Sequence, residues 1–248
     1  MKTIGIIGGL GPMATVYYLE LITRMTDAKK DQEHPRVLLE SLPDAPDRTA
    51  YILGKSTEDP LPVLREAALG LQKLGAGLLT IPCITAHNFY DALSERINIP
   101  MIHLPRCVAQ DVADAGVKKV GILATSGTIQ SGVLGKELDA AGVETIVPDT
   151  DMQELVMQII YEQIKKGVPV QWEMFRKVAE SLLECGAEKL ILGCTELPLL
   201  RRDVAQVTDP VVARILRQDC VDVLEVLAQH AVLEAEVPLK EEYRNVIR

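Results

Sequence analysis

Aromatic side chains and long apolar runs are both scarce in this chain of 248 residues. Only 4% of the residues are aromatic although 48% are hydrophobic, a composition typical of a soluble globular protein. The apolar runs fall short of the roughly 20 residues that span a bilayer, so we expect no membrane segment. Residues 1–11 are apolar but interrupted by glycines, which indicates a first strand and turn rather than a signal peptide.

Basic stripes and paired-cysteine motifs are lacking as well. The net charge is −9, and lysine and arginine form no stripe interleaved with aromatic residues, which argues against nucleic acid as a partner. The five cysteines include no CxxC pair and no metal-type spacing to the four histidines, so we expect no metal site and a reducing, cytoplasmic setting. Three cysteines in helical patterns are interpreted as small buried apolar residues: Cys107, Cys185 and Cys220.

Short β-rich runs alternate with longer helical patterns along the chain. This alternation predicts an α/β fold with parallel sheets covered by helices on both faces. The predicted strands are Thr3–Ile7, Arg36–Glu40, Gly77–Ile81, Lys118–Leu123 and Lys189–Leu192. The predicted helices include Met13–Thr26, Leu61–Leu74, Asp151–Lys166, Trp172–Cys185 and Pro210–Gln229.

Two stretches of the chain resemble each other at a constant spacing. Aligning residues 73–86 with residues 184–197 places Cys83 on Cys194, and residues 2–11 resemble residues 118–127 in the same way. We therefore predict two pseudo-symmetric α/β domains with the active site in the cleft between them. The predicted domains are residues 1–99 with 208–230 and residues 100–207, followed by a peripheral tail over residues 231–248.

Cys83 and Cys194 each stand where an apolar run ends and polar residues begin. The carboxyl ends of parallel strands are where α/β sheets place ligands. An expected helix start follows each cysteine, and backbone N–H groups there lower the pKa of a thiol. Two opposed thiols suit the inversion of a stereocentre, because a thiolate removes a proton from one face of a carbon and a thiol returns one to the other. A single thiol would suit nucleophilic catalysis or decarboxylation instead.

Residues 9–14 follow the first strand and fit the pattern GxGxxA, with Glu40 at the end of the second strand. A nucleotide-binding domain has such a loop. Two other interpretations fit as well, and we favour them. In one, the glycines turn the chain and Pro12 begins a helix. In the other, this helix start, with Met13 in its first turn, binds a small carboxylate.

Several further polar residues are candidates for the site. Arg48 lies after the second strand and Lys165 ends a helix, and the alternative for such cations is solvated surface charge. Thr128, in the loop 123–128, either binds a carboxylate or caps a helix. His87 either orients the thiol of Cys83 or packs inward. Glu196 is either a proton relay for Cys194 or the cap of a turn.

Several motifs occur together in this chain, in the order IGIIGGLGP, KKDQEHPRV, PDRTAYILGK, PCITAH, LATSGTIQSGV and GCTELP. With them the chain resembles the aspartate racemases of the aspartate/glutamate racemase superfamily, which act without pyridoxal phosphate. The likeness reaches to about Gln229. Glutamate racemases of this superfamily have an acidic residue in the first loop and a histidine after the second Cys-Thr pair. Here Gly8 and Glu196 stand at these places, so the aspartate racemase branch fits better.

The resemblance implies roles for named residues, no cofactor and a homodimer. Cys83 and Cys194 would be the two acid/base residues, the second acting on the L-isomer and the first on the D-isomer. The side-chain carboxylate of the substrate would be held by Arg48 and Lys165. The α-carboxylate would be held by Ile84, Thr85, Ala86 and Thr128. Apart from the resemblance, the hydroxyl of Thr195 can donate a hydrogen bond beside Cys194.

Ile84 departs from the family pattern, which has asparagine after the first cysteine. An aliphatic side chain dries the pocket, so we expect it to raise the pKa of Cys83 and to spare Cys194, which Thr195 follows. On this basis the D-to-L direction would need a higher pH.

Our prediction is a cofactor-independent racemase that acts on aspartate or a related dicarboxylic amino acid. Three alternatives stay open on the sequence alone. They are a related isomerase or decarboxylase with an altered pocket, an NAD-binding dehydrogenase, and a non-catalytic protein that binds carboxylates.

Overall fold

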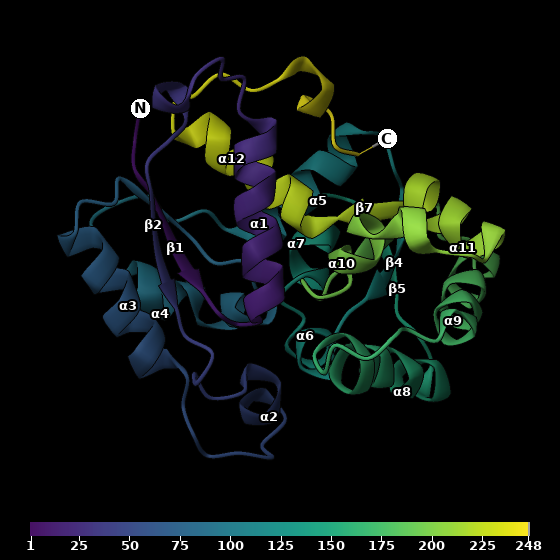
Figure 1. The fold of residues 1–248 in the computed structure, drawn as a ribbon. Helices are drawn as coiled ribbons and strands as arrows, with labels where there is room; N and C mark the ends of the chain where they lie inside the picture. The colour runs from purple at the N-terminus through teal and green to yellow at the C-terminus, as the bar shows by residue number, and fades with distance from the viewer. Residues whose placement is uncertain (248) are drawn as a thin grey trace.

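Parallel strands form two separate sheets in the computed structural model, which describes residues 1–247 of the chain (Figure 1). The first sheet has the order β2-β1-β3 and the second the order β5-β4-β6-β7. The strands of the first sheet are β1 (Ile4–Gly8), β2 (Val37–Ser41) and β3 (Leu78–Thr80). Those of the second are β4 (Lys119–Leu123), β5 (Glu144–Ile146), β6 (Lys189–Leu192) and β7 (Cys220–Asp222).

The two sheets share one topology. β1 and β4 hold equivalent places, each with the next strand on one side and the third strand on the other. Within each sheet, every pair of neighbouring strands is parallel. The prediction of two pseudo-symmetric parallel-sheet α/β domains is therefore confirmed. β7 is an addition to the second sheet.

Helices connect the strands and cover the sheets, as parallel crossovers require. The helices of the first half are α1 (Pro12–Met25), α2 (Arg48–Ile52), α3 (Leu61–Lys73) and α4 (Tyr90–Ser94). Those that follow are α5 (Leu104–Asp114), α6 (Ser126–Ser131), α7 (Gly135–Ala140), α8 (Thr150–Gln158), α9 (Trp172–Glu184), α10 (Pro198–Arg202), α11 (Pro210–Arg214) and α12 (Val223–Glu234). Within residues 1–247, none of them combines the length and the apolar character that crossing a membrane needs.

The glycine loop after β1 leads directly into the helix α1. Gly11 is the N-cap of this helix and Pro12 its first residue, where the missing N–H costs nothing. Tyr18, Leu21 and Ile22 recur at helical spacing and are buried. This face packs against α12, so the last long helix covers the first half.

The region predicted as one helix over Pro210–Gln229 is different in the structure. α11 runs into a π-helical turn over Ile215–Asp219, and the chain then extends into β7 before α12 begins. The helical prediction is wrong here because Cys220–Asp222 are fully buried and pair with β6, while the Asp222 carboxylate caps α12. The segment thus contributes to both halves, and the predicted domain boundaries stay a prediction.

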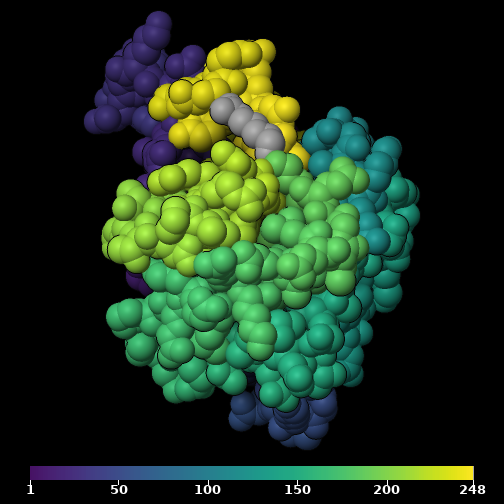
Figure 2. Space-filling view, turned by 90° about the vertical axis from the view of Figure 1, so that its right-hand side faces the viewer, coloured from purple at the N-terminus to yellow at the C-terminus, as the bar shows by residue number. Residues whose placement is uncertain are grey.

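The segment after Ala231, predicted as a peripheral tail, contributes to the core. Val237, Leu239, Val246 and Ile247 are buried in the cluster that contains α1 and α12. Figure 2 shows the C-terminal part of the chain (yellow) beside a segment of its N-terminal part (purple), above the second half (teal to green). The charged residues of this segment led to the prediction of a peripheral tail, although its apolar residues are buried.

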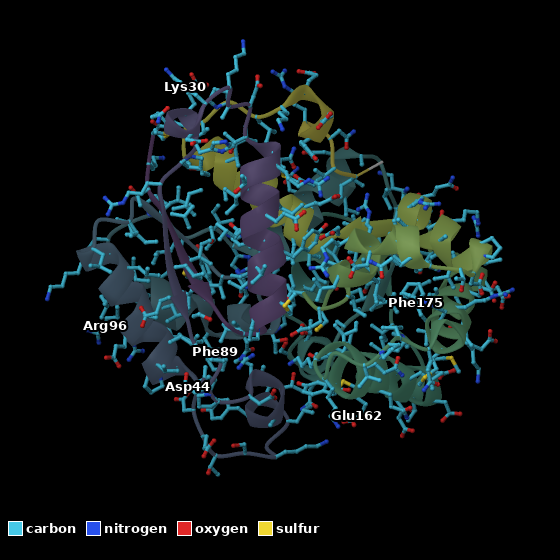
Figure 3. All side chains as sticks on the ribbon, in the orientation of Figure 1. Lys30, Asp44, Phe89, Arg96, Glu162 and Phe175 are labelled. Atoms are coloured by element: carbon cyan, nitrogen blue, oxygen red, sulfur yellow. The ribbon has the colours of Figure 1, made fainter. Side chains whose placement is uncertain are left out.

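Each half has an apolar cluster of its own, and a third cluster joins the two halves through α1, α5, β4 and α12. The two phenylalanines of the chain mark the clusters of the separate halves: Phe89 packs in a cluster of the first half and Phe175 in one of the second. Figure 3 shows the two rings far apart on opposite sides of the molecule, with charged residues such as Lys30, Arg96 and Glu162 at the periphery.

Threonine hydroxyls join the two halves where α2 and the loop after β3 meet α6. Thr49 Oγ1 donates to Thr125 Oγ1 at 3.0 Å, and the hydroxyls of Thr85 and Thr128 are 2.8 Å apart. Gly127 lies in the same contact, where an added Cβ would stand 2.8 Å from Thr49 Cα. We call this contact the threonine seam, and its tightness depends on the missing side chain of Gly127.

A buried histidine ties the loop after β3 to α5. His87 is 3% exposed; its Nδ1 lies 2.8 Å from the carbonyl oxygen of Cys83, and its Nε2 accepts from the N–H of Leu104 at 3.2 Å. These partners fit a neutral ring with its proton on Nδ1. Burial is the main reason that the pKa of His87 falls to about 4, although the Cys83 carbonyl opposes it.

The threonine seam generates a first prediction. Gly127→Ala should lower the free energy of unfolding by roughly 1–3 kcal/mol, because the new methyl group meets backbone atoms of α2. Gly135→Ala is the matched control, since Gly135 also lies in the first turn of a short helix but has nothing within 4 Å of its Cβ position. That variant should be neutral or slightly more stable. Urea unfolding of both variants tests the prediction, and equal effects would contradict it.

His87 generates a second prediction. Between pH 6.5 and 4 the unfolded chain binds a proton at this residue and the folded chain does not, so stability falls as the pH falls through this window. From pH 7 to pH 4.5 this group should remove about 2–3 kcal/mol of stability. His87→Gln should be less stable at pH 7 but should lose that much less on acidification. The measurement is urea unfolding of both proteins at the two pH values. The same pH dependence in both would show that His87 is not held neutral.

Candidate active site

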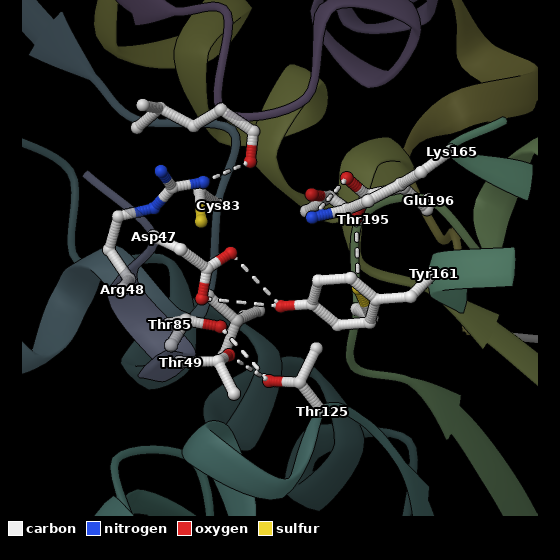
Figure 4. A pocket seen from close by; sticks show the side chains of 13 residues that line it. Asp47, Arg48, Thr49, Cys83, Thr85, Thr125, Tyr161, Lys165, Thr195 and Glu196 are labelled. Atoms are coloured by element: carbon white, nitrogen blue, oxygen red, sulfur yellow. Dashed lines mark hydrogen bonds and ion pairs between the residues drawn. The ribbon is translucent and has the colours of Figure 1, made fainter. Parts of the chain in front are cut away.

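Cys83 and Cys194 lie at equivalent places in the two halves, Cys83 after β3 and Cys194 after β6. Each thiol is buried, with 6% of the residue exposed, and both line the same cavity. The remaining lining residues of this inner cavity come from both halves: Leu10, Asp47, Arg48, Thr49, Ile84, Thr85, Thr125, Tyr161, Lys165, Thr195 and Glu196. Figure 4 shows Arg48 and Cys83 on one side of it and Lys165, Glu196 and Tyr161 on the other.

The inner cavity is small in this structure. Its volume is about 10 Å³, room for a single water molecule. A larger cavity of about 420 Å³ adjoins it and is lined by the glycine loop after β1 and by the start of α1, including Met13. Five residues line both cavities: Leu10, Asp47, Arg48, Lys165 and Glu196. An amino acid is larger than the space beside the thiols, so residues around the inner cavity must move for one to bind there.

Glu196 holds the thiol of Cys194. The Cys194 Sγ donates to Glu196 Oε2 at 2.8 Å, and Glu196 Oε1 forms an ion pair with Lys165 Nζ at 3.6 Å. Burial, then the charge of Glu196, raise the pKa of Cys194 well above its ordinary value, and Lys165 opposes this. Burial alone would lower the pKa of Lys165, but Glu196, Cys194 and Tyr161 raise it above the usual value for lysine.

This electrostatic arrangement corrects two expectations from the sequence. The helix start after Cys194 does not lower the pKa of its thiol, because burial and the Glu196 carboxylate outweigh the backbone N–H groups. The prediction that Cys194 is the spared thiol is wrong for the same reason. Glu196 contacts the thiol with its side chain, while its carbonyl oxygen accepts from the N–H of Leu199 in the turn that follows.

Arg48 is a buried cation held by backbone carbonyls. It begins α2 instead of lying in a loop, and its guanidinium donates to the carbonyl oxygens of Ala45, Pro46 and Leu10 at 2.8–3.2 Å. Its Nε is buried and has no hydrogen-bond partner within the described residues 1–247. The site therefore contains a fixed positive charge with one N–H free for an acceptor.

Asp47 and Tyr161 link the two halves beside the thiols. The Tyr161 hydroxyl donates to Asp47 Oδ2 at 3.1 Å, and the Asp47 carboxylate also caps α2 by accepting from the N–H of Ala50. Lys165 Nζ lies 4.4 Å from the centre of the Tyr161 ring. Sequence reasoning missed both residues. The position of Asp47 before a helix and the four-residue spacing of Tyr161 and Lys165 were the available signals.

The threonines of the seam form one hydroxyl cluster at the floor of the cavity. The hydroxyls of Thr125 and Thr128 are 3.2 Å apart, and Thr85 contacts both. Thr125, not Thr128, is the N-cap of α6, because its hydroxyl accepts from the N–H of Thr128. Thr49 was missed in the sequence, since nothing local marks a residue that acts across the seam.

The other residues named from the sequence lie at different depths. Ile84 and Thr195 line the inner cavity, while Met13 is half exposed and lines the outer one. Ala86 is fully buried behind the cavity wall, and Thr128 reaches the cavity through Thr85. His87 contacts the carbonyl of Cys83, so it positions the backbone of that loop.

Comparisons with known proteins agree with this arrangement. The family model described as Asp/Glu/Hydantoin racemase matches residues 7–231. The structure of an aspartate racemase from Picrophilus torridus is similar over 100% of both chains, with a TM-score of 0.82 and 28% identity. The broad specificity amino-acid racemase RacX of Bacillus subtilis is 26% identical over 206 residues, 78% of this chain and 85% of that protein. The glutamate racemase of Deinococcus radiodurans is 33% identical over 152 residues, 59% of this chain and 51% of that protein.

These matches span both halves of the chain and both strand ends that present the thiols. The predicted enzyme class, an amino-acid racemase among the isomerases, is confirmed by them. The chain belongs to the Asp/Glu/hydantoin racemase family.

Proposed function

We propose that this protein racemises aspartate by two-base proton transfer between Cys83 and Cys194. The observation that carries the proposal is the meeting of two equivalent thiols, one from each half, in a single buried cavity. Proton transfer between two thiols through an α-carbanion changes no oxidation state. The reaction therefore needs no redox cofactor, and the absence of pyridoxal phosphate is what the family resemblance implies.

One shared proton is sufficient for the cycle. Cys194 holds a proton in the resting enzyme, because burial and Glu196 raise its pKa. A thiolate at Cys83 removes the α-proton of the D-isomer, and Cys194 returns its own proton to the opposite face, which yields the L-isomer. The proton then lies on Cys83, and the thiolate of Cys194 is ready for an L-isomer. This assignment follows the family resemblance and the protonated state of Cys194.

The cations of the cavity favour a substrate with a second carboxylate. Arg48 and Lys165 both line the inner cavity, and Arg48 has a free buried N–H. A buried cation needs an acceptor, and a carboxylate is the strongest partner for a guanidinium. We assign the α-carboxylate to Thr85 and the backbone of the Cys83 loop, because they line the same cavity. The similarity to the Picrophilus torridus aspartate racemase supports the same substrate class.

Thermodynamics limits how far the rate constants of the D-to-L and L-to-D directions can differ. Enantiomers have equal free energies, so kcat/KM must be equal in the two directions at every pH. The asymmetry expected from Ile84 can appear only in kcat and KM separately. The shared alkaline limit of kcat/KM reports the loss of the one proton that the pair shares. The homodimer and the cytoplasmic location that we infer from the sequence stay predictions.

A third prediction concerns the thiols of Cys83 and Cys194. Cys83→Ser and Cys194→Ser should each lower racemisation of aspartate by about 10²–10⁴-fold or more, because an alcohol replaces an acid/base group. Each variant should still exchange the α-proton of one isomer: the L-isomer in Cys83→Ser and the D-isomer in Cys194→Ser. Cys185→Ser is the control, since Cys185 is exposed and lines neither cavity. Chiral chromatography and NMR in D₂O measure both reactions. Full racemisation by either catalytic variant would refute the two-base proposal.

A fourth prediction concerns Glu196. Its charge raises the pKa of Cys194, so Glu196→Gln should move the alkaline limb of kcat/KM to lower pH. Glu196→Asp keeps the charge and should keep most of the alkaline limb. The measurement is the pH dependence of kcat/KM for aspartate. An unchanged alkaline limb in Glu196→Gln would show that Glu196 does not hold the proton on Cys194.

A fifth prediction concerns Arg48. Arg48→Ala should cost about 2–5 kcal/mol in kcat/KM for aspartate, as for a broken buried charge pair, and much less for alanine. Lys166→Ala is the control, because Lys166 is exposed and pairs with Glu162 on the surface. Equal losses for aspartate and alanine would mean that Arg48 only supports the loops whose carbonyls it binds.

A further inference from the structure

A third thiol lies beside an imidazole and a carboxylate, away from the racemase cavity. Cys107 and Asp111 are four residues apart on α5, so they share one face of that helix. α12 packs against this helix and brings His230 to the same place. His230 Nε2 lies 3.0 Å from Asp111 Oδ1 and 3.2 Å from Oδ2, so the carboxylate fixes the ring.

A cavity of about 240 Å³ opens over these residues. Cys107 and His230 both line it, and none of its lining residues belongs to the inner or outer cavity of the racemase site. Apolar side chains of Leu78 and Ile102 form part of its wall. The thiol is half-buried, so a small molecule can reach it without unfolding the protein.

The imidazole is held in its charged form. Burial would lower the pKa of His230, but its hydrogen bonds with Asp111 and Cys107 raise it to about 10. An imidazolium beside a thiol stabilises the thiolate, which is the form that attacks electrophiles. A metal is not the better explanation, because residues 1–247 contain no group of three His, Cys, Asp or Glu side chains able to hold one.

We propose that Cys107, His230 and Asp111 form a second nucleophilic site, which undergoes thiol–disulfide exchange with a small-molecule disulfide bound in this cavity. Cys107 was interpreted from the sequence as a small buried apolar residue, because no local pattern pairs it with a histidine far along the chain. The cavity suits a compact electrophile with an apolar body, which its aliphatic walls would cover.

The exchange is balanced within the site. The sulfur of Cys107 attacks one sulfur of the small disulfide while the S–S bond of that molecule breaks. A new S–S bond joins Cys107 to one half, and the other half leaves as a thiolate. The proton that Cys107 gave to His230 passes to the leaving thiolate, so the products are a mixed disulfide and one small thiol. The disulfide is reduced and Cys107 is oxidised.

Several charged or titratable groups face Cys107 and His230 and affect the charge of this pair. Asp111 and Arg106 face the pair from α5, Glu234 from α12, and Tyr90 from α4. His103 precedes α5 at the cavity wall, and Tyr18 of α1 is coupled to the thiol. Burial lowers the pKa of His103, so among the imidazoles here His230 carries the positive charge at neutral pH.

The test compares cysteines within the same molecule. The native protein is treated at pH 6 with dithiodipyridine, a neutral aromatic disulfide, and the modification of each cysteine is followed by peptide mass spectrometry. Cys185 is the internal control, because it is more exposed than Cys107. Cys107 should react at least about tenfold faster than Cys185.

His230→Gln keeps a polar side chain but cannot carry the charge. In this variant the rate at Cys107 should fall at least about tenfold at pH 6, with Cys185 unchanged. Asp111→Asn should show a smaller effect of the same sign. The proposal is wrong if Cys185 reacts as fast as Cys107 in the wild-type protein. It is also wrong if a folded His230→Gln variant, judged by its thermal transition, keeps the wild-type rate at Cys107.

Discussion

The meeting of two sheet ends across the threonine seam is the constraint on which the site depends. Each half presents one thiol after its third strand, and a thiol from one half alone cannot act on both faces of a carbon. Thr49 with Thr125, Thr85 with Thr128, and Tyr161 with Asp47 hold the halves at hydrogen-bond distance. These contacts are polar, whereas away from the site a continuous apolar cluster joins the two halves. The small inner cavity and the larger outer one lie on the polar side of this junction.

The two halves are alike in backbone but not in charge. Cys194 has a carboxylate at hydrogen-bond distance, while Cys83 lies beside Ile84 and its loop is braced by the buried ring of His87. Lys165 offsets the carboxylate charge from within the cavity. The similar halves supply symmetric geometry, while the residues around each thiol differ. In the two-base mechanism that we propose, this difference decides which thiol carries the shared proton, since one thiol must hold a proton while the other is free to accept one.

Much of this could be predicted from the sequence where local patterns carry the information. The apolar strands of both sheet centres, the repeat and the two cysteines follow from periodicity and spacing, and they agree with the structure. β5 was missed because it is a short, partly exposed edge strand, and β7 because its residues continue a helical pattern. The roles of Glu196 and His87 stayed open, since each depends on which neighbour the side chain meets. Asp47, Thr49 and Tyr161 act across the seam, and contacts between distant segments leave no local signal.

The central claim is that two thiols on opposite faces transfer the proton, and isotope incorporation by the wild-type enzyme tests it most directly. L-aspartate is incubated with the enzyme in D₂O, the reaction is stopped at low conversion, and the enantiomers are separated and weighed by mass spectrometry. The account predicts that the D-aspartate formed carries one deuterium at the α-carbon while the recovered L-aspartate keeps its proton. Deuterium appearing in the recovered L-aspartate as fast as D-aspartate forms would contradict it, because a single base would then serve both faces.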